Sequence, residues 1–302
     1  MNQLDFHISY NCFNKCIFCS SSVSIKKFRS HPISVECILK LLREKNKQGF
    51  TSVNFTGGEP TLVTGFIRLL KETKKIGYRI YVGTNGGNFA DGKFCRETVG
   101  FLDEVCFSCH GHIPRLHNFL TFNKQSFTRL EKAMDNLSKF TVRFSSNTVV
   151  NKYNFDYLDK ILEFLMKKQI KQALISNLAP EGRGLENYDK LAVRLMDFKK
   201  KIPALVKSAD KENFIIRFFG LPACILGRFA CCSNDFSWDE RLTIEQERKK
   251  IFFLKQEPCL LPTRGRVKTV KCRSCLYGKI CGGIFEEYFK KYGDGELAPI
   301  DK

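Results

Sequence analysis

Strand-like and helix-like segments alternate along the first 200 residues, and this alternation restricts the fold more than any other feature of the sequence. Strands that alternate with helices form a parallel sheet covered by helices. Strands are predicted at residues 4–9, 52–56, 78–84, 104–108, 141–146 and 172–176. Helices are predicted at residues 35–49, 64–75, 92–99, 126–137, 155–166 and 188–200. The sequence therefore predicts an α/β fold with six strand–helix units.

A cysteine-rich loop follows the first predicted strand, with Cys12, Cys16 and Cys19 spaced C-x3-C-x2-C. Three thiols cannot all pair as disulfides, and thiolates select zinc, copper(I) or iron–sulfur clusters. A structural zinc ion needs a fourth ligand, and no candidate is close in the sequence. A [4Fe–4S] cluster held by three cysteines keeps one iron available to a substrate. Three buried cysteines, or a zinc loop completed from a distant residue, are the alternatives.

Distinctive residues also follow the second and third predicted strands. Gly57 and Gly58 permit a close backbone approach to a ligand, and the Glu59 carboxylate can accept hydrogen bonds from an ammonium group. A plain strand–turn–helix corner is the alternative. Thr84 and Asn85 end the third strand, where Asn-Gly is also a common turn dipeptide.

The later strand ends carry further candidates, and in barrel folds the chemistry lies on loops at the carboxyl ends of strands. We hypothesise that His110 or Cys109, after the fourth strand, faces the substrate as proton acceptor or hydrogen-atom donor. A lone histidine can equally be structural. Ser145, Asn147 and Asn177 mark the fifth and sixth strand ends, with ordinary loop capping as their alternative.

The C-x3-C-x2-C loop, with Phe18 before its last cysteine and Gly57-Gly58-Glu59-Pro60 after the next strand, resembles the radical SAM superfamily. The resemblance implies a partial (βα)6 barrel of the TIM type. It also implies that Cys12, Cys16 and Cys19 hold a [4Fe–4S] cluster whose open iron is chelated by S-adenosylmethionine (SAM). One electron from the reduced cluster would then release a 5′-deoxyadenosyl radical that abstracts hydrogen from the substrate.

The same resemblance implies a SAM-binding set. Gly58 and Glu59 would contact the methionine amino group. Ser145 and Asn147 would bind the ribose hydroxyls, and Asn177 would line the adenine. The full set of implied SAM-binding residues is Phe18, Gly57, Gly58, Glu59, Thr84, Asn85, Ser145, Asn147 and Asn177.

A second metal signature of the form C-x2-C-x5-C lies near the C-terminus, at Cys272, Cys275 and Cys281. It resembles the shortened SPASM, or twitch-like, domains that carry an auxiliary iron–sulfur cluster. The resemblance implies a fourth ligand upstream, for which Cys224 is the first choice and Cys259 the second. A structural zinc ribbon is the alternative.

Two features of the C-terminal region do not match the full SPASM pattern. Phe285 stands where the full SPASM pattern has a further cysteine, which argues against a second auxiliary cluster. The adjacent Cys231 and Cys232 do not fit one cluster with the others and are either buried thiols or a reactive pair. Residues 1–205 are expected to form the radical SAM core and residues 206–302 the auxiliary domain.

The composition indicates the cellular compartment and the class of partner. The 302-residue chain shows no signal peptide and no apolar run of about 18 residues, so a cytoplasmic protein is expected. Its 14 cysteines then indicate metal or redox chemistry. The formal charge of +19 suits RNA or a peptide with an acidic leader. Solvated lysines near helix ends are the favoured explanation, because the sequence has no RNA-binding motif.

The expected function is a radical SAM enzyme that oxidises, epimerises or cross-links a ribosomally made peptide. A radical SAM enzyme acting on RNA or a small metabolite is one alternative, and a non-enzymatic zinc or iron–sulfur binding module is another. Flavodoxin or ferredoxin is the expected reductant. Because the cluster loop begins at Cys12, we expect no leader-binding domain before it, and a leader-peptide-binding partner would then present the peptide.

Overall fold

The computed structural model describes residues 2–300. Within them, nine strands form one sheet in the order β7-β6-β5-β4-β3-β2-β1-β8-β9. Their bounds are β1 (Gln3–Ser9), β2 (Ser52–Gly57), β3 (Arg79–Thr84), β4 (Glu104–Ser108), β5 (Arg143–Val149), β6 (Gln172–Ser176), β7 (Ile215–Phe219), β8 (Arg241–Arg248) and β9 (Phe252–Cys259). Strands β1 to β7 pair in chain order and in parallel. This arrangement confirms the predicted fold class.

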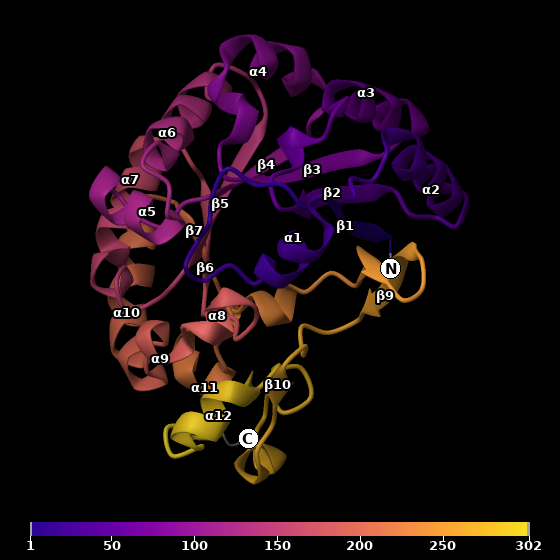
Figure 1. The fold of residues 1–302 in the computed structure, drawn as a ribbon. Helices are drawn as coiled ribbons and strands as arrows, with labels where there is room; N and C mark the ends of the chain where they lie inside the picture. The colour runs from indigo at the N-terminus through magenta and orange to yellow at the C-terminus, as the bar shows by residue number, and fades with distance from the viewer. Residues whose placement is uncertain (1, 301–302) are drawn as a thin grey trace.

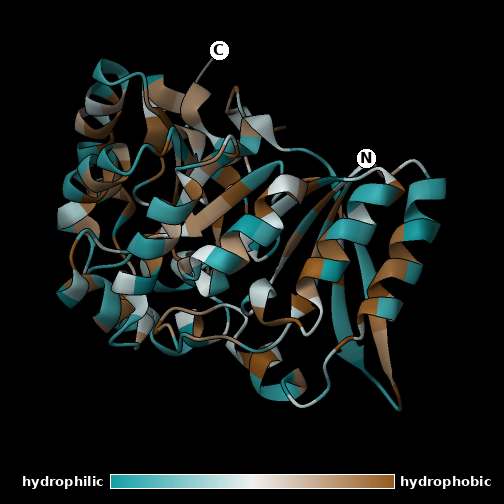
Figure 2. Ribbon diagram, turned by 90° about the horizontal axis from the view of Figure 1, so that it is seen from above, coloured by the Kyte–Doolittle hydropathy of each residue, from teal (hydrophilic) through white to brown (hydrophobic). Residues whose placement is uncertain are grey.

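Helices cover the outer side of the curved sheet (Figure 1). They are α2 (Val35–Lys47), α3 (Phe66–Ile76), α4 (Gly92–Thr98), α6 (Ser126–Leu137), α7 (Leu158–Lys167) and α10 (Leu195–Lys211). Shorter helices lie near the loops, namely α1 (Ser22–Phe28), α5 (Pro114–Thr121), α8 (Arg183–Glu186), α9 (Tyr188–Leu191) and α11 (Ala223–Leu226). Hydrophilic and hydrophobic residues alternate along the outer helices, as an amphipathic layer requires (Figure 2).

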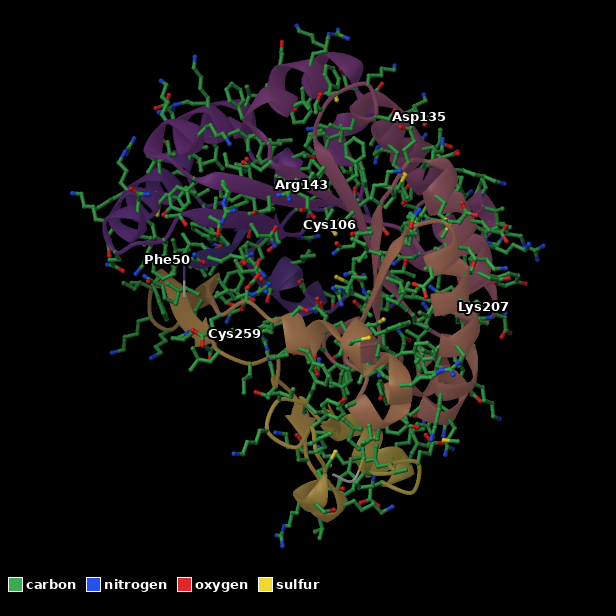
Figure 3. All side chains as sticks on the ribbon, turned by 180° about the vertical axis from the view of Figure 1, so that it is seen from behind. Phe50, Cys106, Asp135, Arg143, Lys207 and Cys259 are labelled. Carbon is green, nitrogen blue, oxygen red and sulfur yellow. The ribbon has the colours of Figure 1, made fainter. Side chains whose placement is uncertain are left out.

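Strand β4 shows how the core is built. Val105 and Phe107 are fully buried, whereas Glu104, Cys106 and Ser108 are partly exposed. Side chains alternate between the two faces of a strand, so the apolar set packs beneath the helices and the other set lines the concave side. Figure 3 shows Cys106 and Arg143 on this inner side, with Asp135 and Lys207 on the outside.

The C-terminal region packs at one end of the arc. It contains a short antiparallel pair, β10 (Arg266–Val267) and β11 (Ile284–Phe285), followed by α12 (Glu286–Tyr292). The Leu195 amide donates to the Tyr288 hydroxyl at 2.9 Å, and the Arg194 Nε donates to the Glu296 carboxylate at 2.8 Å. The start of α10 is therefore fastened to the C-terminal region.

Three details differ from the sequence prediction. The helix predicted at 188–200 is divided into α9 and α10, and α10 continues past Pro203 to Lys211. The predicted division between residues 205 and 206 therefore lies inside a helix. The hairpin β8–β9 was not predicted because its charged and polar residues are unfavourable in strands. No helix within residues 2–300 combines the length and apolarity needed to cross a membrane.

Candidate functional site

The cysteine loop after β1 is fixed to the junction between α5 and α6. The Lys15 amide donates to the Thr121 carbonyl at 2.9 Å, and the Ile17 amide donates to the Leu120 carbonyl at 3.0 Å. The Asn123 side chain adds a bond to the Phe13 carbonyl at 3.1 Å. An irregular loop needs such partners for its backbone groups, and here they also set where the cysteines lie.

The opposite side of the loop is held by the segment after β6. Arg183 Nη1 donates to the Cys16 carbonyl at 3.2 Å, and the Arg183 amide donates to the Cys19 carbonyl at 3.0 Å. Asn187 Nδ2 donates to the Ile17 carbonyl at 2.9 Å. Sequence reasoning gave Arg183 and Asn187 no role. The sequence marks these two residues only by their position after the sixth strand, and many residues with a purely structural role lie at such positions.

The three thiols share one poorly solvated environment. Burial raises the pKa of Cys12 to about 12 and also raises the pKa values of Cys16 and Cys19. The electrostatic influence of Cys12 and Cys19 raises the pKa of Cys16 further. Three partly buried thiolates on one short loop need a positive partner, and iron supplies it, so this donor set fits an iron–sulfur cluster.

Hydrogen bonds also reach a cluster-loop sulfur directly. Asn85 Nδ2 donates to Cys12 Sγ at 3.3 Å, and the Asn14 amide donates to the same atom at 3.4 Å. Across residues 2–300, no three Cys, His, Asp or Glu side chains converge closely enough to hold a single metal ion. A cubane cluster has a different requirement, because each thiolate binds a separate iron.

The glycine pair at the end of β2, Gly57 and Gly58, contacts the backbone of the chain itself. The Gly58 amide donates to the Ser9 carbonyl at 2.6 Å, and the Glu59 amide donates to the Asn11 carbonyl at 2.7 Å. A Cβ added at Gly57 would lie 2.3 Å from the Ser9 carbonyl oxygen, and one at Gly58 would lie 2.3 Å from that of Asn11. The glycines therefore permit residues 57–59, the GGE segment, to pack directly against the backbone that leads into the cysteine loop.

Glu59 is fully buried and connects the ends of β2 and β3. Its Oε1 accepts hydrogen bonds from the Thr61 amide, the Thr61 hydroxyl and the Thr84 hydroxyl, and its Oε2 accepts one from the Asn85 amide at 2.9 Å. Burial raises the pKa of this carboxyl, and the donors oppose that rise. Of the two oxygens, Oε2 has more accepting capacity left for an ammonium group.

His110 and Cys109 both have structural partners. His110 is buried, its Nδ1 accepts from the Val149 amide at 3.2 Å, and its ring centroid lies 4.6 Å from that of Phe18. Burial holds the pKa of His110 well below its usual value. The fully buried Cys109 directs its thiol to the Gly111 carbonyl. Both side chains are therefore held by neighbouring residues, and the role of either one toward the substrate is still a prediction.

The remaining predicted SAM-binding residues bind neighbouring strands. The Ser145 hydroxyl donates to Glu104 at 2.7 Å, and Asn147 accepts from the Ser176 hydroxyl at 2.7 Å. Asn177 Nδ2 donates to the Gly220 carbonyl at 3.1 Å. Asn147 lies within β5, which extends to Val149, and not after its end. The SAM-binding role of these residues is still a prediction.

The C-terminal cysteines form a second group. Cys281 Sγ accepts from the Ala223 and Gly283 amides, each at 3.4 Å. Cys259 ends β9, where its carbonyl accepts from the Trp238 indole at 3.3 Å. One small cavity has four cysteines among the residues that line it, namely Cys224, Cys272, Cys275 and Cys281. This grouping favours Cys224 over Cys259 as a fourth ligand.

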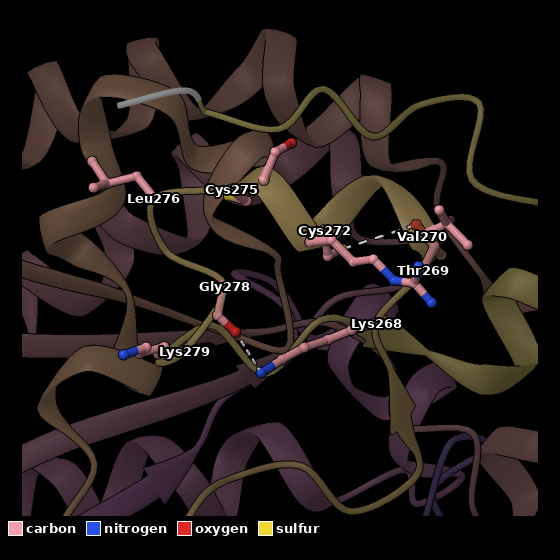
Figure 4. Close-up of a pocket in the computed structure, with 10 residues that line it drawn as sticks. Lys268, Thr269, Val270, Cys272, Cys275, Leu276, Gly278 and Lys279 are labelled. Carbon is pink, nitrogen blue, oxygen red and sulfur yellow. Dashed lines mark hydrogen bonds between the residues drawn. The ribbon is translucent and has the colours of Figure 1, made fainter.

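A larger, open hollow lies on the outside of this second group. Lys268 Nζ donates to the Gly278 carbonyl at 2.7 Å and spans the hollow next to Cys272 and Cys275 (Figure 4). The adjacent cysteine pair lies elsewhere, after β7. The exposed Cys231 has its carbonyl bound by Arg217 Nη1 at 2.7 Å, and Cys232 is half-buried.

Curated relatives match at low identity. An S-adenosylmethionine-dependent nucleotide dehydratase of Lacinutrix mariniflava is 25% identical over 229 residues, covering 70% of this chain and 47% of that protein. This chain thus spans about half the length of that relative. A probable GTP 3′,8-cyclase of Saccharolobus islandicus is 25% identical over 223 residues, covering 72% of this chain and 70% of that protein.

Solved structures share the fold. Streptococcus suis SuiB bound to S-adenosylmethionine matches with a TM-score of 0.67 at 16% identity, covering 96% of this chain and 74% of that one. Native anSMEcpe with bound AdoMet and Kp18Cys peptide matches with a TM-score of 0.56 at 23% identity, covering 71% and 63%. The model of the radical SAM superfamily matches residues 6–165, which is more than half of the chain. The chain therefore belongs to the radical SAM superfamily.

Proposed function

We propose that this radical SAM enzyme modifies a peptide, using a SAM-binding cluster in the barrel and an auxiliary cluster in the C-terminal region. The supporting observation is the likeness to SuiB over 96% of the chain, which includes the C-terminal region. SuiB has been solved with its precursor peptide SuiA, and anSMEcpe with the Kp18Cys peptide. Oxidation, epimerisation and cross-linking are the candidate reactions.

In the barrel, Cys12, Cys16 and Cys19 are proposed to hold the SAM-binding cluster. When bound, the cluster and SAM together supply a 5′-deoxyadenosyl radical for hydrogen abstraction. The chain's own part is to keep the loop in place through Arg183 and the α5–α6 junction, and to shield it from water. Asn85 orients Cys12 through its bond to Sγ.

Around SAM, Gly58 and Glu59 are proposed to face the methionine amino group. The hydrogen bonds from Thr84 and Asn85 fix the Glu59 carboxylate, so its orientation is set before SAM arrives. Phe18, Gly57, Ser145, Asn147 and Asn177 complete the proposed set.

Reductive cleavage of SAM gives a direct test of the radical step. Anaerobically reconstituted protein with SAM and dithionite should form 5′-deoxyadenosine, measured by mass spectrometry. Deuterium transferred from a labelled candidate peptide into this product would identify the substrate class. A metal-binding module without enzymatic function would form no 5′-deoxyadenosine.

The auxiliary cluster has its own test. We propose Cys224, Cys272, Cys275 and Cys281 as its ligands, because they line one cavity. Two cubanes predict about eight irons per chain, whereas a zinc ribbon predicts about four irons and one zinc. Cys224→Ala should lower the iron content, whereas Cys259→Ala should not. Equal iron loss in both variants would contradict the choice of Cys224.

A nucleotide is the second candidate substrate. It is favoured by the names of the curated relatives, a nucleotide dehydratase and a probable GTP cyclase, which match at the sequence level. The formal charge of +19 suits a polyphosphate as well as an acidic peptide. The same deuterium-transfer assay with labelled nucleoside triphosphates separates the two classes.

A further inference from the structure

A basic hollow lies against the outside of the cysteine loop. Its wall combines Phe13, the residue directly after Cys12, with Lys124, Arg129 and Lys132 around α6. We call Phe13, Lys124, Arg129 and Lys132 the donor face. We propose that the donor face docks an acidic one-electron carrier protein that reduces the SAM-binding cluster. This inference rests on the proposed function, which needs one electron for each SAM cleaved.

Ion pairs among residues 2–300 do not neutralise the charge of the donor face. Within residues 2–300, none of Lys124, Arg129 and Lys132 forms an ion pair, whereas Lys74 and Lys168 elsewhere do. The carboxylate that lines the hollow, Asp91, accepts hydrogen bonds from the amides of Lys93 and Phe94 at the start of α4. A carrier with surface carboxylates would therefore find unpaired cations.

The donor face and the cysteine loop are one packed unit. The Arg129 guanidinium lies 4.1 Å from the centroid of the Phe13 ring, and Asn123 bonds the Phe13 carbonyl. Next to them Phe122 is 70% exposed and has a left-handed backbone with φ of 50°. Left-handed backbone is unfavourable for a bulky residue, and an exposed ring gives a partner apolar contact.

These features fit a protein partner. Arginine and aromatic residues are enriched at the centres of protein interfaces, and charges around them steer the encounter. The step itself is an electron transfer in which no bond forms or breaks. The carrier loses one electron, and the cluster gains it. Contact at Phe13 would place the carrier's redox centre next to the Cys12 side of the cluster loop.

The test compares charge reversals on two faces. Lys124→Glu combined with Lys132→Glu alters the donor face, and Lys207→Glu combined with Lys211→Glu is the matched control on the exposed side of α10. Both pairs change the net charge equally. With dithionite, the wild type and both variants should form 5′-deoxyadenosine at equal rates, because dithionite needs no docking surface.

With reduced flavodoxin as electron source, the donor-face variant should lose on the order of tenfold in rate at low salt, whereas the control stays within about twofold. Binding of oxidised flavodoxin, measured by calorimetry, should weaken in the same variant only, and in the wild type it should weaken as salt rises. Equal flavodoxin-driven rates and affinities in all three proteins would overturn the proposal. The proposal would also be overturned if RNA bound the donor face more tightly than flavodoxin does.

Failure of all three proteins with dithionite would have a different meaning. It would overturn the proposed function, and the electron-transfer role of the donor face with it. If all three proteins form 5′-deoxyadenosine with dithionite and only the donor-face variant is slow with flavodoxin, the result supports both the proposed function and the role of the donor face.

Discussion

At the scale of single residues, the three cysteines of the loop are proposed to hold the SAM-binding cluster, and a substitution at Cys16 tests this proposal. Its thiol is one of the three on the loop that are proposed as ligands, so its removal leaves two for the cluster. Cys16→Ala should lose about four irons per chain and all measurable 5′-deoxyadenosine formation. Cys37→Ala, at an exposed cysteine in α2, should retain both. Iron analysis of the two variants, made anaerobically, checks this prediction.

Gly58 tests the close approach between the GGE segment and the loop. A Cβ there would lie 2.3 Å from the Asn11 carbonyl oxygen, so the backbone must move. We expect Gly58→Ala to lower the free energy of unfolding by about 1–3 kcal/mol, as overpacking does, and to impair cluster retention. Gly100→Ala is the control, because a Cβ there meets nothing within 4 Å. Equal stability of the two variants in chemical denaturation would contradict the packing argument.

At the scale of residues, the sequence identifies the loop cysteines and the GGE segment, but it does not predict the contacts that hold them in place. The sequence predicts Gly57 and Gly58 as ligand contacts, and it does not predict their close approach to the backbone of Ser9 and Asn11. Arg183 and Asn187 were missed because hydrogen bonds to carbonyls of a distant loop leave no local spacing signal.

Among the elements, the α5–α6 junction depends on a neutral histidine. His117 Nδ1 accepts from the His110 amide at 3.2 Å, and burial lowers the pKa of His117 to about 3. The unfolded chain binds a proton near pH 6.5 and the folded chain does not. This group therefore contributes stability above pH 6.5 that is lost as the pH falls toward 3.

The pH dependence can be measured against a variant. The difference in free energy of unfolding between the wild type and His117→Gln should shrink by about 1.4 kcal/mol per pH unit as the pH falls from about 6.5 to 5. His31→Gln, at an exposed position, is the control variant measured in parallel. A constant difference between the wild type and His117→Gln across this range would contradict the prediction.

A buried ion pair fastens the C-terminal region to the segment after β7. Arg266 Nη1 lies 2.7 Å from Asp235 Oδ2, and their side chains are 0% and 1% exposed. The Gly282 amide donates to the same oxygen at 3.1 Å, directly after Cys281. Three atoms of this pair, Asp235 Oδ1 and Arg266 Nε and Nη2, have no partner within the described residues. Breaking the pair would therefore be costly, and its hydrogen bonds only partly compensate for the desolvation of the two charges.

We expect Asp235→Asn to destabilise the protein by about 3–5 kcal/mol, because it leaves the Arg266 charge buried without its partner. The double variant Asp235→Leu with Arg266→Met should recover most of this loss, since no buried charge remains. Chemical denaturation of the variants measures both effects. A double variant less stable than Asp235→Asn would show that the pair itself is needed.

At the scale of the whole molecule, the sequence predicted the first six strands and their parallel order, because each strand–helix unit carries its own periodicity. It did not predict that the sheet continues past β1 through β8 and β9. That extension depends on pairing between segments more than two hundred residues apart, which local patterns do not encode. The grouping of Cys224 with the late cysteines was expected only from resemblance, and the cavity they share supports it.

The central claim is that a cluster held by Cys12, Cys16 and Cys19 offers one iron to SAM. The electron paramagnetic resonance spectrum of the anaerobic, dithionite-reduced protein tests it most directly. The account predicts that adding SAM shifts the g values of one cluster signal in the wild type, and that no such shift occurs in Cys16→Ala. Superimposable wild-type spectra with and without SAM would contradict it.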